Sequence, residues 1–558
     1  MKKCYLFVLL LLIASSVAAQ DSYSAMSQAA LETMWGAEDS TGYRDALNLY
    51  EAAFKRFPDS IDHLGLYKAS VLAGELKEYD KAFAYLTPVA EVEVDEFGNP
   101  GWAYIVGDYS SSEYENLLGD PRWKAMEVTA QKRKQLFFEK LKEAEAEFFA
   151  SKGYDFKEAE PTKALYRELR NANPYLSKVQ QSYSISLPVN DTATTSYFVH
   201  LPKTYQPARK YPVLIFLHGA VRYNSFKSYQ NKSVLDGWNR YYRDYAEKYG
   251  VILVFPQASR QFNWMVPDDG FFLIPNIVKQ LKTGINVDDD KVFLSGHSNG
   301  ATGSFSYLMK QPTGFAGFYG FNTYPRVFTG GTFIENVLNR SFINFSTDQD
   351  YYYPPAANDK LSDLMENLSA DYKDHRYNGF PHWFPAFDES EPAYEILFED
   401  LDQRKREAFP KSISWEFDDE KYGAIDWLSE IKLDTFASPS TWHEAMNFKI
   451  DQWLDYDDND SLIVEKVDRV AFPMPRKSGK IIARFANNIF TIETSRIKSF
   501  QIRLSPEMIN VKKKVQVFIN GKLCHNKKVS FNRSYMLNSF EQERDRTQVW
   551  VNYIKVQL

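Results

Sequence analysis

The stretch that decides the fold reads KVFLSGHSNGATGSFSYL and spans residues 291–308. It begins with the short apolar run 291–294, which is typical of a buried strand, and it ends with residues 301–308, which can open a helix. Between them, residues 296–300 fit the pattern G-x-S-x-G, in which a serine lies on a strained turn from strand to helix. The bare pattern arises by chance about one time in six in a chain of this length. Its strand and helix context predicts that Ser298 is a nucleophile rather than a serine of a surface turn.

On the N-terminal side of this stretch, apolar runs alternate with helix-like segments. The runs 213–217 and 251–255 are continuous and suit buried parallel strands, while 182–187 and 197–201 suit paired edge strands. Helix-like segments lie around 238–249 and 271–281. This alternation predicts a doubly wound α/β sheet over residues 178–410.

Together these residues resemble the α/β-hydrolase fold, and within it the secreted esterases related to poly(3-hydroxybutyrate) depolymerases and feruloyl esterases. The resemblance covers roughly residues 183–399. It rests on LHGA at 217–220, PDDGFF at 267–272, GHSNG at 296–300, Asp350 and His382. It implies a catalytic triad in the chain order serine, acid, histidine.

The histidine of the triad can be found by elimination. The four histidines that follow Ser298, as the chain order requires, are His375, His382, His443 and His525. The last two lie outside the alternating segment, and His375 lies within the predicted strand 372–377. His382 follows that strand in a loop, where sheets of this kind place reacting groups. His382 is therefore the predicted base; the alternative is a histidine that only packs against Trp383.

The acid is chosen between two aspartates, Asp348 and Asp350, which follow the predicted strand 342–345. The resembling family often has its acid four residues before a proline. Asp350 and Pro354 match that spacing, so Asp350 is preferred. The other aspartate would cap a turn or remain solvated.

The chemistry that this arrangement implies is acyl transfer. His382 takes the hydroxyl proton as Ser298 attacks an ester carbonyl, and Asp350 holds the imidazole. The backbone N–H groups of Asn299 and Ala220 are the expected oxyanion hole. Trp264 and Tyr351 are candidates for the substrate pocket, although aromatic residues also fill cores.

No cofactor or metal is expected. The segment His443-Glu444 lacks the second histidine of a zinc protease, there is no G-x-x-x-x-G-K loop, and the chain has only two cysteines. The predicted function is a carboxylesterase that acts on a small-molecule or polysaccharide-linked ester. A serine peptidase of the same fold is one alternative, and a non-catalytic scaffold with a vestigial triad is another.

The N-terminus predicts export. Two lysines, a short apolar run over residues 5–14, and small residues before a cleavage position after Ala19 are typical of a signal peptide over 1–19. We expect the product to be periplasmic or extracellular, with no membrane span. The mature chain would keep one cysteine, Cys524, and so could form no internal disulfide.

Two further regions flank the predicted sheet, as expected for 558 residues at roughly 150 per domain. Residues 20–177 have helical periodicity, and the similarity of 79–83 to 43–47 resembles a tetratricopeptide repeat; such a region could bind a protein partner, or simply pack. Residues 411–558 alternate with period 2, as in 500–504 and 515–519, and predict an all-β sandwich that binds carbohydrate or serves as a structural appendage. The formal charge of -7 argues against nucleic acid as a partner.

Overall fold

The structure is a computed structural model that describes residues 22–558 except 108–109, 155, 157–161 and 460. The predicted signal peptide, 1–19, lies outside the described residues. The chain divides into two compact units that meet at Glu143 and Ala144. In the described part of the chain, no helix has both the length and the apolar character needed to cross a bilayer.

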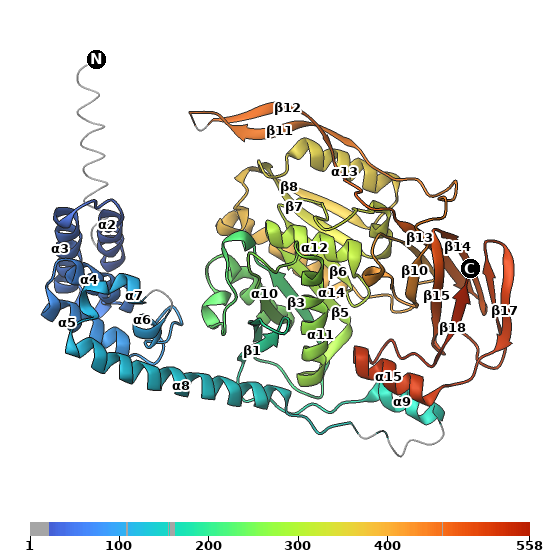
Figure 1. The fold of residues 1–558 in the computed structure, drawn as a ribbon, viewed down its shortest axis with the longest axis horizontal. Helices are drawn as coiled ribbons and strands as arrows, with labels where there is room; N and C mark the ends of the chain where they lie inside the picture. The colour runs from blue at the N-terminus through green and yellow to red at the C-terminus, as the bar shows by residue number, and fades with distance from the viewer. Residues whose placement is uncertain (1–21, 108–109, 155, 157–161, 460) are drawn as a thin grey trace. The chain divides into compact units, whose positions relative to one another are not determined.

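The first unit consists of helices (Figure 1). Asp39 and Asp62 accept hydrogen bonds from N–H groups in the first turns of the second and third helices, which fixes where these helices begin. The two similar segments seen in the sequence lie on alternate helices, α3 and α5, and the tetratricopeptide resemblance stays a prediction. The helices are α2 (Tyr23–Trp35), α3 (Ser40–Arg56), α4 (His63–Glu75), α5 (Tyr79–Glu91), α6 (Ala103–Val106), α7 (Ser110–Glu113) and α8 (Pro121–Phe149), which continues into the second unit.

The helical unit is shorter than the predicted domain 20–177. Residues 144–177 belong to the second unit instead. There, α9 (Thr162–Asn171) buries Leu165 and Leu169 against Met536 and Phe540. An amphipathic helix must bury its apolar face. The partner of α9 lies more than 360 residues further along the chain, so local periodicity alone could not assign the helix to its unit.

The second unit contains an eight-stranded sheet with the order β1-β2-β4-β3-β5-β6-β7-β8. The first two strands are antiparallel to their neighbours, and all other pairs are parallel. The predicted runs form its strands, and β6 was not predicted. The strands are β1 (Ser182–Pro188), β2 (Thr194–His200), β3 (Tyr211–Leu217), β4 (Ile252–Pro256), β5 (Val287–Gly296), β6 (Gly317–Phe321), β7 (Ser341–Gln349) and β8 (Tyr372–Pro381).

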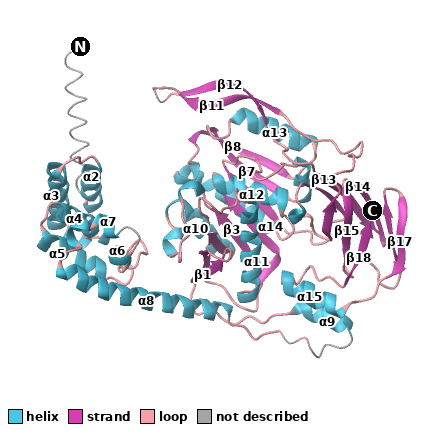
Figure 2. Ribbon diagram, in the orientation of Figure 1, coloured by secondary structure: helices cyan, strands magenta, loops and turns pink. Residues whose placement is uncertain are grey.

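Both faces of this sheet are buried, which explains its continuous apolar runs. Along β3, Val213 and Ile215 face one core cluster, and Leu214 and Phe216 face another. Helices α11 (Leu273–Gly284), α12 (Asn299–Lys310) and α13 (Pro355–Asn367) contribute to the first cluster. Helices α10 (Arg240–Tyr249) and α14 (Glu391–Gln403) contribute to the second. Figure 2 shows the sheet between these helices. The result is a mixed α/β fold with helices on both sides of a mostly parallel sheet.

The C-terminal region contains a five-stranded sheet, β17-β16-β14-β13-β9, a three-stranded sheet, β10-β15-β18, and a separate hairpin of β11 and β12. The hairpin and helix α15 (Arg533–Glu543) were not predicted. The strands are β9 (Ser412–Phe417), β10 (Leu428–Leu433), β11 (Lys449–Tyr456), β12 (Leu462–Val470), β13 (Gly479–Ala486), β14 (Ile489–Ser495), β15 (Ile497–Leu504), β16 (Lys514–Ile519), β17 (Lys522–Lys528) and β18 (Asn552–Gln557).

A network of buried charges joins the C-terminal region to the eight-stranded sheet. Lys282 of α11 lies 2.9 Å from Asp289 of β5 and 3.2 Å from Asp545. Arg546 also pairs with Asp289, at 2.9 Å, and Arg406 with Asp545, at 3.0 Å. Removing Asp289 would leave Arg546 without a charged partner in the interior, which costs several kcal/mol. The two parts therefore form one compact unit rather than separable domains.

Candidate active site

Ser298 lies on a sharp turn between β5 and α12. Its backbone has φ 58° and ψ -121°, a conformation that costs on the order of 1–3 kcal/mol for a residue with a side chain. The turn needs both glycines of the pattern, because a Cβ on Gly300 would collide with the Leu217 carbonyl and one on Gly296 with the backbone of Gly300. Ser298 remains half-buried rather than enclosed. Its strained position at the end of a strand presents the hydroxyl at the edge of the sheet.

Two backbone N–H groups, those of Asn299 and Ala220, are the predicted oxyanion hole. Within the described part of the chain, neither the N–H of Asn299 nor that of Ala220 donates a hydrogen bond. Ala220 has φ 53° and ends the loop after β3, and Asn299 is the first residue of α12, whose dipole favours negative charge. The Asn299 side chain accepts a hydrogen bond from the Val221 N–H at 3.2 Å, which holds the loop against the helix.

The ring of His218 fixes the shape of this loop. Its Nε2 accepts a hydrogen bond from the Ala258 N–H at 3.2 Å, so the proton must be on Nδ1, which lies 2.7 Å from the Gly219 carbonyl oxygen. Burial lowers the pKa of His218 to about 4, so the ring is neutral near pH 7, as this hydrogen-bond pattern requires.

His382 and Asp350 form a buried pair. His382 follows β8 directly, and its Nδ1 lies 2.9 Å from Oδ1 of Asp350. The same carboxylate oxygen accepts a hydrogen bond from the Tyr352 N–H at 2.9 Å. Asp348 lies elsewhere: it accepts a hydrogen bond at 2.8 Å from the N–H of Gly379, a residue of β8 with positive φ. The structure therefore pairs His382 with Asp350 and not with Asp348.

The structure does not bring Ser298 and His382 into a hydrogen bond. Nε2 of His382 is buried and has no hydrogen-bond partner. A buried polar atom without a partner is costly and calls for an explanation. A nucleophile and its base often reach hydrogen-bonding distance only when substrate is bound, and an Nε2 without a partner is free to accept the Ser298 proton.

Two further side chains hold the backbone of His382 in place. Nε2 of His297 lies 2.8 Å from the His382 carbonyl oxygen, and Asn322 donates to the same oxygen from Nδ2 at 2.7 Å. Thr347 in turn donates to Oδ1 of Asn322 at 3.1 Å. Sequence reasoning missed both positioning residues. The variable second position of G-x-S-x-G could have indicated His297, but Asn322 follows the unpredicted strand β6 and carries no sequence signal.

Because His297 and His218 are buried as neutral rings, we expect the protein to lose stability in mild acid. Burial, with a smaller effect of His382, lowers the pKa of His297 to about 3. Because unfolded histidines titrate near pH 6.5, the unfolded chain binds more protons, and stability is lost as pH falls below that value. Between pH 7 and pH 5 we expect each ring to lower the free energy of unfolding by about 2 kcal/mol. Urea unfolding should show a smaller loss in His297→Gln; an equal loss would contradict the prediction.

Of the two predicted pocket residues, Trp264 needs correction, and the role of Tyr351 stays a prediction. Trp264 has no exposed surface, and its ring packs 4.8 Å from the His218 ring and against Gly303, so it supports the loop from within the core instead of lining a pocket. Tyr351 is half-buried and does not contact the histidine ring directly. Its neighbour Tyr352 does, with 4.3 Å between the ring centroids, and it is 51% exposed. Because a loop does not alternate regularly, the sequence could not decide which tyrosine faces His382.

A small cavity lies beside the oxyanion loop. It has a volume of about 290 Å³, and its lining includes His218 and Gly219 of the loop together with polar side chains, among them Lys227, Gln230 and Gln257. Gly219 also adjoins Ser298, whose Cβ would lie 3.0 Å from a Cβ placed on Gly219, although Ser298 itself does not line this cavity. Its size suits a small group rather than a long chain.

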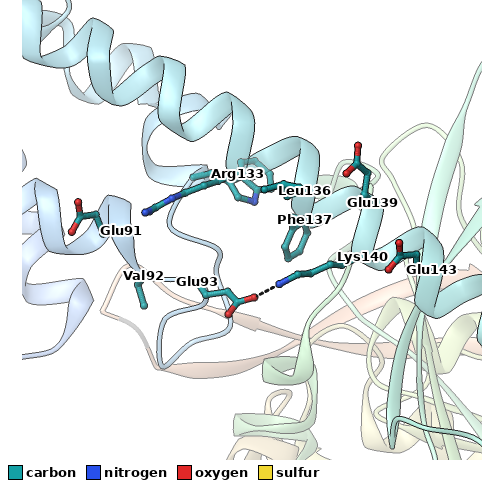
Figure 3. Close-up of a pocket in the computed structure, with 10 residues that line it drawn as sticks. Glu91, Val92, Glu93, Arg133, Leu136, Phe137, Glu139, Lys140 and Glu143 are labelled. Atoms are coloured by element: carbon teal, nitrogen blue, oxygen red, sulfur yellow. Dashed lines mark hydrogen bonds and ion pairs between the residues drawn. The ribbon is translucent and has the colours of Figure 1, made fainter.

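The helical unit has a cavity of its own, about 440 Å³ in volume (Figure 3). Leu136 and Phe137 of α8 line it beside an ion pair between Lys140 and Glu93 at 2.6 Å. It contains none of the predicted site residues. The prediction that this region binds a protein partner remains a prediction.

Two other kinds of side-chain cluster could carry chemistry, a metal site and a hydrogen-bonded group around His443. Among the described residues, no group of three or more histidine, cysteine, aspartate or glutamate side chains could hold a metal ion. In the C-terminal region, His443 lies 2.8 Å from Oγ of Ser495 and 2.9 Å from Glu416. Ser495 and Glu416 are buried, so these hydrogen bonds satisfy polar atoms in the interior of the C-terminal region.

Comparison with known proteins supports the reading of the Ser298 region. Residues 192–324, less than half of the chain, match a family model described as putative esterase. No curated protein matches. Solved structures that the chain resembles include a thermostable esterase, at 20% identity and TM-score 0.33, over 40% of this chain and 64% of that one. Esterase 2 of Thermogutta terrifontis, at 12% and 0.32, is matched over 41% and 94%.

A third structure is the S-formylglutathione hydrolase FrmB of Staphylococcus aureus, at 13% identity and TM-score 0.30, over 40% of this chain and 100% of that one. The evidence for an esterase therefore comes from the family match. The matched residues include both Ser298 and Ala220. The segment that carries the strained serine and the oxyanion loop is that of a carboxylesterase-like serine hydrolase.

Proposed function

We propose that this protein is an exported carboxylesterase that hydrolyses esters through Ser298, His382 and Asp350 and an acyl-enzyme intermediate. Two observations carry the proposal. Ser298 has a strained backbone and is flanked by two N–H groups that donate no hydrogen bond in the described part of the chain. His382 and Asp350 form a buried pair at 2.9 Å. Strain at a residue with a side chain is maintained only where the surrounding structure enforces it.

The reaction follows from these positions. Oγ of Ser298 attacks the ester carbonyl, and its proton passes to Nε2 of His382, which has no other partner. Asp350 stabilises the positive ring through Nδ1. The N–H groups of Asn299 and Ala220 bind the oxyanion, each worth about 3 kcal/mol of barrier. The tetrahedral intermediate collapses as His382 returns the proton to the leaving alcohol, and water then releases the acid by the same steps in reverse order.

We assign the cavity beside Gly219 to a small polar group of the substrate. Its polar lining, which includes Lys227 and Gln230, can bind oxygen atoms of a short or hydroxylated substituent. The ester itself is either a small molecule or is linked to a larger carbohydrate. Export rests on the sequence of residues 1–19, and the proposed compartment is periplasmic or extracellular.

Turnover of p-nitrophenyl acetate beside a peptide p-nitroanilide tests the ester preference. We expect kcat/KM for the ester to exceed that for the anilide by at least about 100-fold, as for an enzyme whose transition-state binding is directed at esters. Faster anilide hydrolysis would make the protein a peptidase. Failure to hydrolyse either substrate, together with no labelling of Ser298 by a fluorophosphonate, would indicate a scaffold.

A further inference from the structure

The hairpin of β11 and β12 stands apart from the other strands. It forms a two-stranded sheet of its own. Its second strand is exposed over nearly its whole length, including Leu462, Ile463 and Val464. A two-stranded hairpin is only marginally stable in water, so contacts with the rest of the unit must hold it in place.

These contacts lead to the loop that carries the candidate acid. Lys360 of α13 forms an ion pair with Asp451 of the hairpin at 2.8 Å. The ring of Trp453 lies 6.3 Å from that of Tyr353. Tyr353 and α13 both follow Asp350 closely in the chain, and Figure 1 shows the hairpin beside this helix. The hairpin therefore rests on the segment that positions the candidate triad.

A row of aromatic rings connects His382 to the hairpin. The Tyr352 ring lies 4.3 Å from the His382 ring, the Tyr351 ring 4.2 Å from that of Tyr352, and the Tyr456 ring of β11 5.4 Å from that of Tyr351. Tyr352 is 51% exposed and Tyr456 is 39% exposed. The row starts at the candidate base and ends on an element of the C-terminal region, so both parts of the unit contribute to one surface.

The chemistry of this row suits ring-shaped groups that carry hydroxyls. Tyrosine presents an apolar face for stacking and a polar tip for hydrogen bonds. The tyrosine hydroxyls of the row can donate hydrogen bonds to, and accept them from, hydroxyls of such a ring. A linear acyl chain would instead require a continuous apolar channel. The row therefore favours a hydroxylated ring over a fatty chain.

We propose that the β11–β12 hairpin is part of the substrate-binding site, and that Tyr352, Tyr351 and Tyr456 select esters whose alcohol consists of several hydroxylated rings. This inference rests on the proposed esterase function. One ring next to the scissile bond reaches Tyr352, and a further ring reaches Tyr456. Tyr456 is distant from the reacting atoms, so it contributes binding that is the same in the ground and transition states and acts on KM.

The test compares two substrates that differ only in length, a monoacetylated methyl glucoside and a monoacetylated cellotetraose. In Tyr456→Ala, the ratio of kcat/KM for the long acetate to that for the short one should fall about fivefold, through KM, as expected for the loss of one stacking contact. Tyr456→Phe keeps the ring and should retain most of the ratio. Leu523→Ala, which removes another exposed apolar side chain of the C-terminal region, is the matched control.

Three outcomes would decide against the inference. An unchanged ratio in Tyr456→Ala, with a normal wild-type rate on both acetates, would overturn it and leave the proposed function intact. A loss confined to p-nitrophenyl decanoate would show that the row binds the acyl chain instead. If the wild type hydrolyses no ester at all, the proposed function is wrong and this inference is wrong with it.

Discussion

Replacing Ser298 by alanine should lower kcat for ester hydrolysis about 10⁶-fold, to the level that binding and the oxyanion hole alone provide. The hydroxyl oxygen is the atom that becomes acylated, and no neighbouring side chain can take its place on the turn at φ 58°. Labelling by a fluorophosphonate should disappear at the same time, because only an activated serine reacts with it.

The matched control for Ser298→Ala is Ser412→Ala, which removes an exposed hydroxyl of β9. It should leave both the rate and the labelling unchanged. Because alanine adopts the strained conformation at about the same cost as serine, Ser298→Ala should keep the wild-type melting temperature. A folded Ser298→Ala variant that still hydrolyses esters or still takes the label would show that another residue is the nucleophile.

Replacing Asp350 by asparagine should lower kcat about 10⁴-fold. The side-chain oxygen can still accept the hydrogen bond from the Tyr352 N–H, so the loop keeps its shape. The negative charge is lost, however, and neither the Nδ1–H tautomer of His382 nor its positive form is then stabilised. The measurement is kcat in a folded variant whose circular dichroism matches that of the wild type.

Asp348→Asn is the control for Asp350→Asn within the same loop. Asparagine keeps the oxygen that accepts the Gly379 N–H, so this contact persists and kcat should change by less than about threefold. The two variants lie two positions apart in the chain, and each replaces one carboxylate oxygen by an NH2 group. If Asp348→Asn lost activity and Asp350→Asn did not, the acid would be Asp348 and the assignment would be wrong.

Much of the α/β part could be predicted because its signals are local. A strand buried on both faces has to be a continuous apolar run, as in 213–217 and 251–255, and a serine at a strained turn needs glycines around it. Chain order then predicted His382 as the histidine of the candidate triad. The structure adds what no local pattern contains: that Asp350 rather than Asp348 lies against the ring, and that Tyr352 rather than Tyr351 covers it.

The residues that support the site could not be predicted from the sequence, for a different reason. Asn322 and His297 act through the His382 carbonyl oxygen, and they reach it from the ends of β6 and β5. Neither has a spacing to His382 that any motif prescribes. Trp264 shows the opposite error, since a position near a strand end suggested a pocket residue and the chain folds the ring into the core.

By itself, the sequence determined the alternation of strands and helices and the strained serine turn, because each depends on a period or spacing of a few residues. The residue types of the candidate triad followed from chain order. Tertiary structure alone decided which carboxylate meets the histidine, where residues 144–177 pack, and that a hairpin from the C-terminal region reaches the tyrosines beside His382. Those features depend on contacts between segments that lie tens to hundreds of residues apart. Such contacts are selected by the total burial of apolar surface and charge, and no local stretch of the chain encodes that sum.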